Sequence, residues 1–232
     1  TKTNGLKAKE KKVKEKVPFS KASFLGGCYQ AAVCLIFLPV LWTVAALPSV
    51  WLGGAILAQA GHLFVVSLPA LVALWWLSAT ALVIMSKWLV IGRFKAGEHQ
   101  LRSRYYYQWW TVWLTMQSYQ ALTAVWLVFV PESKLINVFY RLLGAKIGKN
   151  VSINGFVLND YDLITIEDNV SVSGSSTLSP SRLSHKGLSL KAIHLENNSE
   201  TNQHSVVECG DVLKANTIIN HFGKNPQDLL VF

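Results

Sequence analysis

The sequence lacks Asp, Glu, Lys and Arg throughout one long stretch, from Ala22 to Ser86. Only His62 within it carries a side chain that can charge near neutral pH. A membrane-spanning helix needs about 20 apolar residues, so this stretch has room for two spans and a turn. Channels and transporters usually carry ionisable residues inside the membrane, and their absence argues against that class. We therefore expect an integral membrane protein with another role.

Cysteine is also scarce. The three cysteines are Cys28, Cys34 and Cys209. The first two are six residues apart, on different faces of a helix, and the third is alone. Neither a disulfide framework nor a metal site has this spacing, so we expect no bound metal.

Basic residues outnumber acidic ones, and the resulting net charge of +9 is unevenly distributed along the chain. Residues 1–21 contribute +6 and residues 87–104 contribute +4, whereas the chain from residue 105 onward sums to −1. Basic residues beside a span prefer the cytoplasmic face, where they meet anionic lipid. Two spans place both basic segments, and with them the N-terminal tail and the C-terminal domain, in the cytoplasm. Nucleic acid is not expected as a partner, because the C-terminal half has no basic stripe.

Composition divides the chain into three parts. Residues 1–22 form a basic tail or linker, and residues 23–130 form the membrane region, with spans at about 24–47 and 63–86. Residues 131–232 form a separate domain. Helix-breaking residues mark the connection between the spans: Pro48, Gly53, Gly54 and Gly61.

Residues 109–130 form a further uncharged stretch, interrupted by Thr, Gln and Ser. Tyr and Trp gather at its start, as at a membrane–water interface. We favour a helix that lies in the interface or packs on the hairpin. A third span is the alternative, and it would carry the C-terminal domain to the opposite side.

Short motifs recur in residues 131–232: IGKNVS from Ile147, IEDNVS from Ile166 and LENNSE from Leu195. Such six-residue repeats are typical of a parallel β-helix, in which each aliphatic residue points inward and small or turn-forming residues make the corners. Asn suits a corner because it tolerates left-handed backbone angles. An antiparallel β-sandwich is the alternative. The expected inward positions are Ile147, Ile153, Leu163, Ile166, Val172, Leu178, Ile193 and Leu195.

Three segments carry a resemblance to a known family: KWLVIGRFKAGEHQLRSRYYYQWW at 87–110, FYRLLGAKIGKNVSI and DLITIEDNVSVS. They resemble the membrane-attached C-terminal domains of ε-poly-lysine synthetase-like nonribosomal peptide synthetases, over roughly residues 24–220. That family combines membrane helices with left-handed β-helix, acyltransferase-like domains of the hexapeptide-repeat superfamily. The resemblance implies an α + β membrane protein: a transmembrane helical hairpin and an interfacial helix, followed by the β-helix.

The resemblance also implies an acyl-transfer activity. Adenylation and carrier domains of the same polypeptide would load an amino or carboxylic acid as a phosphopantetheine thioester. This domain would then pass the acyl group to the amine or hydroxyl of a small-molecule acceptor, in contact with the lipid bilayer and without a tightly bound cofactor. Because the chain begins at Thr1 without an initiator Met, we expect it to be part of a longer protein.

Related enzymes often use a His as general base, because imidazole titrates near neutral pH. His185, in the loop LSPSRLSHKGLSL, and His204 are the candidates, although an exposed or structural role is the simpler explanation for each. His194 lies between Ile193 and Leu195 and is expected to point outward from a strand, which makes it the weaker candidate.

Charged residues suggest two further contacts. Arg93 and Lys95 are candidates to bind the phosphate of phosphopantetheine or a lipid headgroup, although membrane anchoring explains them without a ligand. Asp160 and Asp162 are candidates to position an acceptor amine, although such a loop is usually a solvated turn.

Several repeat corners lack the usual Gly. Glu167, Glu196 and Lys214 stand where the family has it, which suggests a partly degenerate repeat. The second hypothesis is therefore a non-catalytic membrane anchor or scaffold module with a degenerate β-helix.

Overall fold

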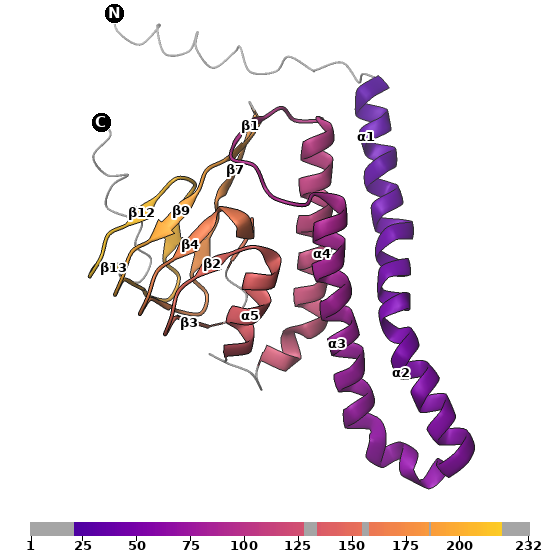
Figure 1. Ribbon diagram of the computed structural model, residues 1–232. Helices are drawn as coiled ribbons and strands as arrows, with labels where there is room; N and C mark the ends of the chain where they lie inside the picture. Colours follow the sequence, from indigo (N-terminus) through magenta and orange to yellow (C-terminus); the bar gives the residue numbers. More distant parts are fainter. Residues whose placement is uncertain (1–20, 128–133, 155–157, 186, 220–232) are drawn as a thin grey trace, which may run out of the picture.

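The computed structural model describes residues 21–127, 134–154, 158–185 and 187–219. Two long helical arms form a hairpin, and a strand-rich C-terminal region lies on the opposite side of a third long helix (Figure 1). The expected basic tail lies outside the described residues as far as residue 20.

The first arm is helical from its start to the hairpin turn. It comprises α1 (Lys21–Ala32), a π-helical turn η2 (Val33–Phe37) and α2 (Leu38–Ala60). Pro39 occupies the first turn of α2. Proline has no N–H to donate to the preceding turn, and the wider π turn directly before it accommodates that missing hydrogen bond.

The chain reverses at η3 (Gly61–Leu63), and α3 (Phe64–Val90) returns along α2 (Figure 1). The expected connection therefore begins too early in the chain: α2 continues through Pro48, Gly53 and Gly54 and ends at Ala60, and only the last marker, Gly61, lies in the turn. Small residues let the two arms approach closely. Ala45 and Ala79 are fully buried, and Ser78 Oγ donates a hydrogen bond to Ala45 O at 2.5 Å. A Cβ atom at Gly53 would meet Leu71 at 3.2 Å.

The described residues contain one nearly continuous helical run, Phe24–Val90, that is long and apolar enough to cross a membrane. Only 11% of its most apolar window is buried inside the protein. Large apolar side chains such as Leu35, Trp51 and Val66 are more than half exposed. These properties fit association with a membrane.

Helix α4 (Arg104–Leu127) packs along α3. One face is buried through Val112, Met116 and Tyr119, and Tyr119 Oη lies 2.8 Å from Thr80 Oγ1 on α3. Thr residues that interrupt the apolar pattern lie within the helix, and the hydroxyls of Thr115 and Thr123 donate to carbonyls four residues earlier. The helix packs on the hairpin, and its position in a membrane interface stays a prediction.

The C-terminal strands pair mainly in parallel, in three sets. The first set is β2 (Lys146–Ile147), β4 (Ile164–Ile166), β9 (Ile193–Leu195) and β12 (Val212–Leu213). The second is β3 (Ser152–Ile153), β5 (Ser171–Val172), β10 (Glu200–Thr201) and β13 (Ile218–Ile219). The third is β6 (Thr177–Leu178) and β11 (Val206–Val207), with a parallel bridge from Leu158 to Leu178.

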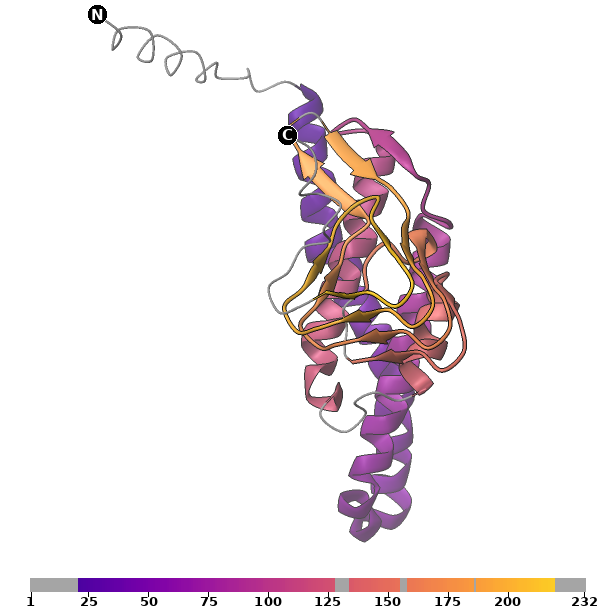
Figure 2. The ribbon, with the colours of Figure 1, turned by 90° about the vertical axis from the view of Figure 1, so that its left-hand side faces the viewer.

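The chain visits these three sets in the same order on each pass, so it winds as a parallel coil of stacked loops (Figure 2). Leu195 pairs with Leu213, and Ile147 pairs with Ile166. In each pair, the number of residues from one partner to the other along the chain equals three six-residue repeats, to within one residue. The parallel pairing rules out the antiparallel sandwich for the described coil strands.

Aliphatic side chains fill the inside of the coil. Seven of the eight expected inward positions are at most 8% exposed, and Ile147 is partly buried. Complete burial of each such side chain stabilises the fold by about 1.5–3 kcal/mol. The short repeats therefore build a single apolar interior.

A β-hairpin interrupts the coil, where the sequence suggested an irregular loop. Strands β7 (Ser181–Ser184) and β8 (Gly187–Leu190) pair antiparallel, and β8 pairs with β1 (Gly97–His99), just after the helical hairpin. The segment that the sequence marked as a loop is therefore mostly strand. The insertion lengthens one turn of the coil, the turn that leads from Ile164 to its pairing partner Ile193.

Helix α5 (Lys134–Leu143) precedes the first strand of the coil. Its residues Ile136, Phe139, Tyr140 and Leu143 recur at helical spacing and are buried. Asn137 Nδ2 donates to Val151 O at 2.7 Å. The helix therefore covers the end of the coil, whose apolar interior would otherwise be open. A 3₁₀ turn, η4 (Tyr161–Leu163), leads into β4.

Candidate functional site

A column of asparagines forms one corner of the coil. Asn150, Asn169, Asn198 and Asn216 have φ angles of 52–59°, in the left-handed region. Side-chain amides connect successive turns: Asn150 Nδ2 donates to Asn169 Oδ1 at 2.9 Å, and Asn198 Nδ2 to Asn216 Oδ1 at 3.2 Å. The expectation that Asn serves left-handed corners is confirmed at these positions.

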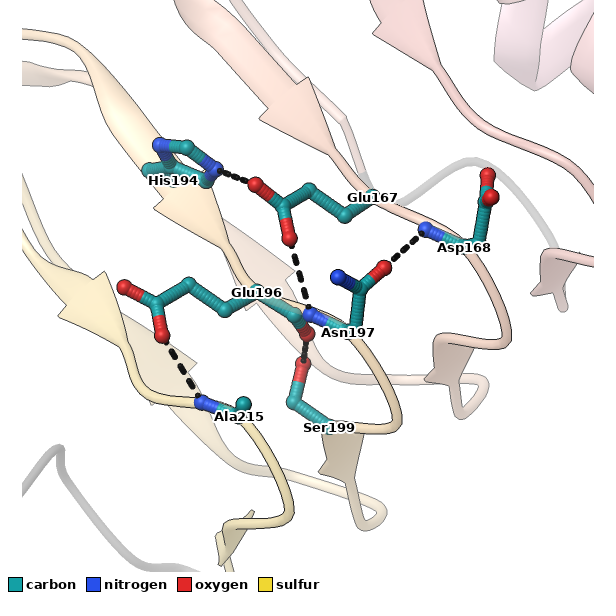
Figure 3. A network of polar contacts seen from close by, with 7 residues as sticks. All are labelled: Glu167, Asp168, His194, Glu196, Asn197, Ser199 and Ala215. Carbon is teal, nitrogen blue, oxygen red and sulfur yellow. Dashed lines mark hydrogen bonds and ion pairs between the residues drawn. The ribbon is translucent and has the colours of Figure 1, made fainter.

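Two carboxylates beside this corner bind backbone N–H groups of the next turn (Figure 3). Glu167 Oε2 accepts from Asn197 N at 3.1 Å, and Glu196 Oε2 accepts from Ala215 N at 3.0 Å. The two glutamates occupy positions where the sequence suggested a lost Gly. Their side chains thus hold adjacent turns together, and the departure from the repeat does not weaken the corner.

Glu167 also contacts an imidazole. Its Oε1 lies 2.8 Å from His194 Nε2, on the outer face of β9 (Figure 3). An ionised carboxylate can only accept a hydrogen bond, so Nε2 carries the N–H that donates to Glu167, and in the neutral imidazole Nδ1 is the acceptor. In Figure 3 Nδ1 points away from Glu167. The imidazole side chain is 41% exposed, so a substrate can reach it.

The arrangement is a histidine oriented by a carboxylate. In this geometry the carboxylate fixes the tautomer and stabilises the imidazolium formed when the histidine takes a proton. Glu167 is itself held on both oxygens, by His194 and by the Asn197 backbone. The pair is therefore a candidate general base.

The two histidines chosen from the sequence lie elsewhere. His185 is exposed in the turn between β7 and β8. His204 is exposed at a coil corner with a φ of 59°, stacked on the turn that contains Ser175, whose φ is 64°. The structure does not bring these two together, and their catalytic role stays a prediction.

The residues suggested for phosphate binding flank a buried phenylalanine. Arg93 and Lys95 are exposed on either side of Phe94, which is 6% exposed. The Lys95 backbone N donates to Tyr105 Oη at 2.8 Å, so α4 holds this segment. Both cationic side chains remain available to solvent.

The two aspartates of the Asn-Asp-Tyr-Asp loop connect the coil to the helices; Asp160 is buried and Asp162 is partly buried. Asp162 Oδ2 lies 2.7 Å from Lys87 Nζ on α3 and accepts from Phe94 N at 3.0 Å. Asp160 Oδ1 accepts from the indole Nε1 of Trp109 on α4 at 2.6 Å. The expectation of a solvated turn is wrong here, and the contacts of both side chains are structural.

Asp160 is an unusual group in this loop. Its backbone is left-handed, with a φ of 49°, and its Oδ2 has no hydrogen-bond partner among the described residues. Burial raises the pKa of its carboxyl to about 6, opposed in part by the hydrogen bond from Trp109. An ionised carboxylate here is thus costly.

Other polar clusters carry less chemistry. No group of three or more His, Cys, Asp or Glu side chains within the described residues could hold a metal ion. Cys28 and Cys34 are exposed, and Cys209 Sγ lies 3.7 Å from Ser189 O.

The sequence contained a signal for the His194 pair. Strand Ile193–Leu195 lies opposite Ile164–Ile166, so aligning the repeats places His194 beside the strand that leads into Glu167. The insertion of β7 and β8 hid this alignment, because it makes that turn of the coil much longer than the turns on either side.

Comparison with known proteins gives one informative similarity. The chain is 30% identical over 155 residues to a delta-poly-L-ornithine synthetase from Acinetobacter baumannii (strain AB307-0294). The match covers 67% of this chain but only 11% of that protein's length. No family model matches the chain, and no solved structure matches it. The similarity links the chain to a synthetase of poly-amino acids.

Proposed function

We propose that this chain is the membrane-anchored acyl-transfer region of a larger poly-amino-acid synthetase. It transfers a carrier-bound aminoacyl group to an amine or hydroxyl acceptor. Support comes from the similarity to the poly-ornithine synthetase along 67% of the chain. Because the match spans a small part of that protein, the adenylation and carrier domains belong elsewhere in the same polypeptide.

The proposal includes the arrangement of the fold in the membrane. The hairpin α2–α3 crosses the bilayer twice, which leaves the N-terminal tail and the coil in the cytoplasm beside their basic segments. The coil is a left-handed β-helix of the hexapeptide-repeat superfamily. In support, the turn from Leu195 to its partner Leu213 has the length of three six-residue repeats, and four asparagines at one corner are left-handed.

The observation that carries the proposal is the contact between His194 and Glu167. His194 Nδ1 takes the proton from the acceptor amine or hydroxyl as its nitrogen or oxygen attacks the thioester carbonyl. The C–S bond breaks, a C–N or C–O bond forms, and the proton passes to the departing pantetheine thiolate. Glu167 stabilises the imidazolium between these two steps.

The remaining residues position the reactants. Arg93 and Lys95 are exposed cations that suit the phosphate of a phosphopantetheine arm. The hairpin confines the domain to the membrane surface, which raises the effective concentration of donor and acceptor and supplies no chemistry itself.

The test uses the full chain in detergent micelles, with ornithyl-phosphopantetheine thioester as donor and free ornithine as acceptor. Wild-type protein is expected to accelerate thiol release and amide formation. His194→Ala is expected to lose about 100-fold or more in rate, the contribution of a positioned general base. Glu196→Gln is the control for disturbing this corner of the coil and is expected to keep the wild-type rate. Glu196 binds the next turn as Glu167 does, but it does not touch a histidine.

A second candidate function is a membrane anchor or scaffold without catalysis. One observation favours it: the contacts of Lys87 with Asp162 and of Trp109 with Asp160 join helices and coil, as a docking module requires. Under this function His194 and Glu167 merely form a surface pair, worth about 0–1 kcal/mol. A wild-type chain that leaves the transfer rate at the uncatalysed level would favour the scaffold.

A further inference from the structure

A basic cleft opens beside the base of the helical hairpin. It has a volume of about 630 Å³ and includes Arg102 and Arg104. Its other lining residues come from α1, α3 and α4: Leu25, Gly26, Tyr29, Val90, Tyr107 and Gln108. The volume lies within the roughly 300–1,000 Å³ of ligand sites. No acidic side chain is among these lining residues, so the cleft suits an anionic group.

An apolar groove continues from this cleft along the first arm. Its volume is about 470 Å³, and it shares Tyr29 and Val90 with the cleft. The other lining residues are Ala32, Val33, Ile36, Phe37, Val40 and Thr111. The combined shape has a cationic end and a hydrocarbon-like end.

The wall between the two parts is held in place. Tyr29 Oη lies 2.8 Å from Thr111 Oγ1, and the rings of Tyr29 and Tyr107 lie 5.3 Å apart. Gln108 Nε2 donates to Val90 O at 2.8 Å. At Gly26 the Tyr107 hydroxyl takes the place of a side chain. These contacts keep α1 at a fixed distance from α4, so the opening is part of the fold.

We infer that cleft and groove together bind one anionic phospholipid, with its phosphate between Arg102 and Arg104 and an acyl chain along the groove. The arginines follow the apolar run Phe24–Val90, at the depth where headgroups lie. Both arginines are exposed and available for charge-assisted hydrogen bonds to a phosphate.

The same features disfavour other occupants. Free phosphate would leave the apolar groove unfilled. The lining residues offer no carboxylate to the choline of a zwitterionic lipid. A helix from a second copy would cover the groove but would not use the two arginines. The lipid site is independent of acyl transfer, because no lining residue belongs to the His194 and Glu167 pair.

The test uses the full chain in phosphatidylcholine nanodiscs that contain a phosphatidylglycerol with a photoactivatable group on its acyl chain. Crosslinks are mapped by mass spectrometry and are expected on the segment from Ala32 to Val40. The double variant Arg102→Gln/Arg104→Gln is expected to reduce labelling at least about fivefold, the ratio that one basic residue near an anionic surface supplies. Lys149→Gln/Lys214→Gln removes the same charge from the coil and is expected to leave labelling unchanged.

A second pair of variants tests the groove separately from the charge. Ala32→Phe places a ring in the groove and is expected to reduce labelling, whereas Ala31→Phe, on the adjacent exposed position, is expected to have no effect. Equal labelling in all variants, or equal labelling by the phosphatidylcholine analogue, would overturn the inference. So would complete displacement by inorganic phosphate, or a dimer that Ala32→Phe dissociates without any lipid labelling.

Discussion

Lys87 Nζ and Asp162 Oδ2 lie 2.7 Å apart, although 75 residues separate them in the chain. Lys87 lies in the last turn of α3, and Asp162 belongs to the turn that enters the second pass of the coil. Their side chains are only 1% and 9% exposed, and the Lys87 ammonium also lies 3.8 Å from the centre of the Trp88 ring. This buried ion pair fixes the helical hairpin against the coil.

Replacing one partner of this pair should destabilise the protein strongly. Lys87→Met leaves Asp162 as a buried, uncompensated charge, and such losses typically cost about 3–5 kcal/mol. The midpoint of urea unfolding in detergent micelles measures the effect. Lys95→Met, which removes an exposed lysine, is the control and is expected to change the free energy of unfolding by less than about 0.5 kcal/mol.

The double variant Lys87→Met/Asp162→Asn separates pairing from packing. It should be more stable than Lys87→Met alone, because the second substitution removes the orphaned charge and keeps an acceptor for Phe94 N. The single variants Lys87→Met and Asp162→Asn are measured for comparison. If their losses of stability add up to the loss in the double variant, the pair is not energetically coupled.

The buried carboxyl of Asp160 makes stability depend on pH. Burial raises its pKa from 3.8 to about 6, so between about pH 4 and pH 6 the folded state holds a proton that the unfolded state releases. The free energy of unfolding therefore falls as pH rises through this window, by up to about 3 kcal/mol, and this contribution is constant above it.

Asp160→Asn removes this titration and keeps an oxygen for the Trp109 indole. The variant should be more stable than wild type at pH 7.5, and the difference should shrink at pH 4.5. Chemical unfolding of both proteins at the two pH values measures this difference, and the comparison cancels contributions that the two proteins share. A difference that stays constant with pH would contradict the assigned pKa.

The asparagine corner predicts a residue-specific effect at position 198. Asn198→Ala loses the amide contact with Asn216. It also places alanine, whose side chain cannot form a local hydrogen bond, at a φ of 57°. Together these changes should lower the free energy of unfolding by about 1–2 kcal/mol. Asn198→Gly loses the same contact but adopts this backbone freely, so it should lie between Ala and wild type in thermal unfolding. A glycine variant less stable than the alanine variant would argue against a strained corner.

Local pattern was enough to predict the interior of the coil. Ile153, Val172 and Leu178 were expected inside from the repeat alone, and all three are buried. The cause is geometric: a strand alternates its faces, and every repeat must bury the same position. The left-handed corners at Asn169 and Asn198 follow from the properties of one residue type in the same way.

Contacts between distant segments could not be predicted in this way. Pairing of Gly97 with Leu190 joins a segment after the helical hairpin to an insertion in the coil, and neither segment's sequence indicates the other as its partner. Glu167 looked like a lost glycine, because its partners Asn197 and His194 come from the next turn. Pro48 suggested a break, but a proline inside an exposed apolar helix is tolerated when neighbouring groups satisfy the freed carbonyl.

The most direct test of acyl transfer compares the three histidines in one assay. Thiol release from ornithyl-phosphopantetheine is measured for wild type, His194→Ala, His185→Ala and His204→Asn, the last chosen because Asn tolerates a positive φ. Only His194→Ala is expected to lose about 100-fold or more in rate, while the other two variants keep the wild-type rate. Full activity in His194→Ala would contradict the role of His194 as general base, whether or not His185→Ala or His204→Asn loses activity.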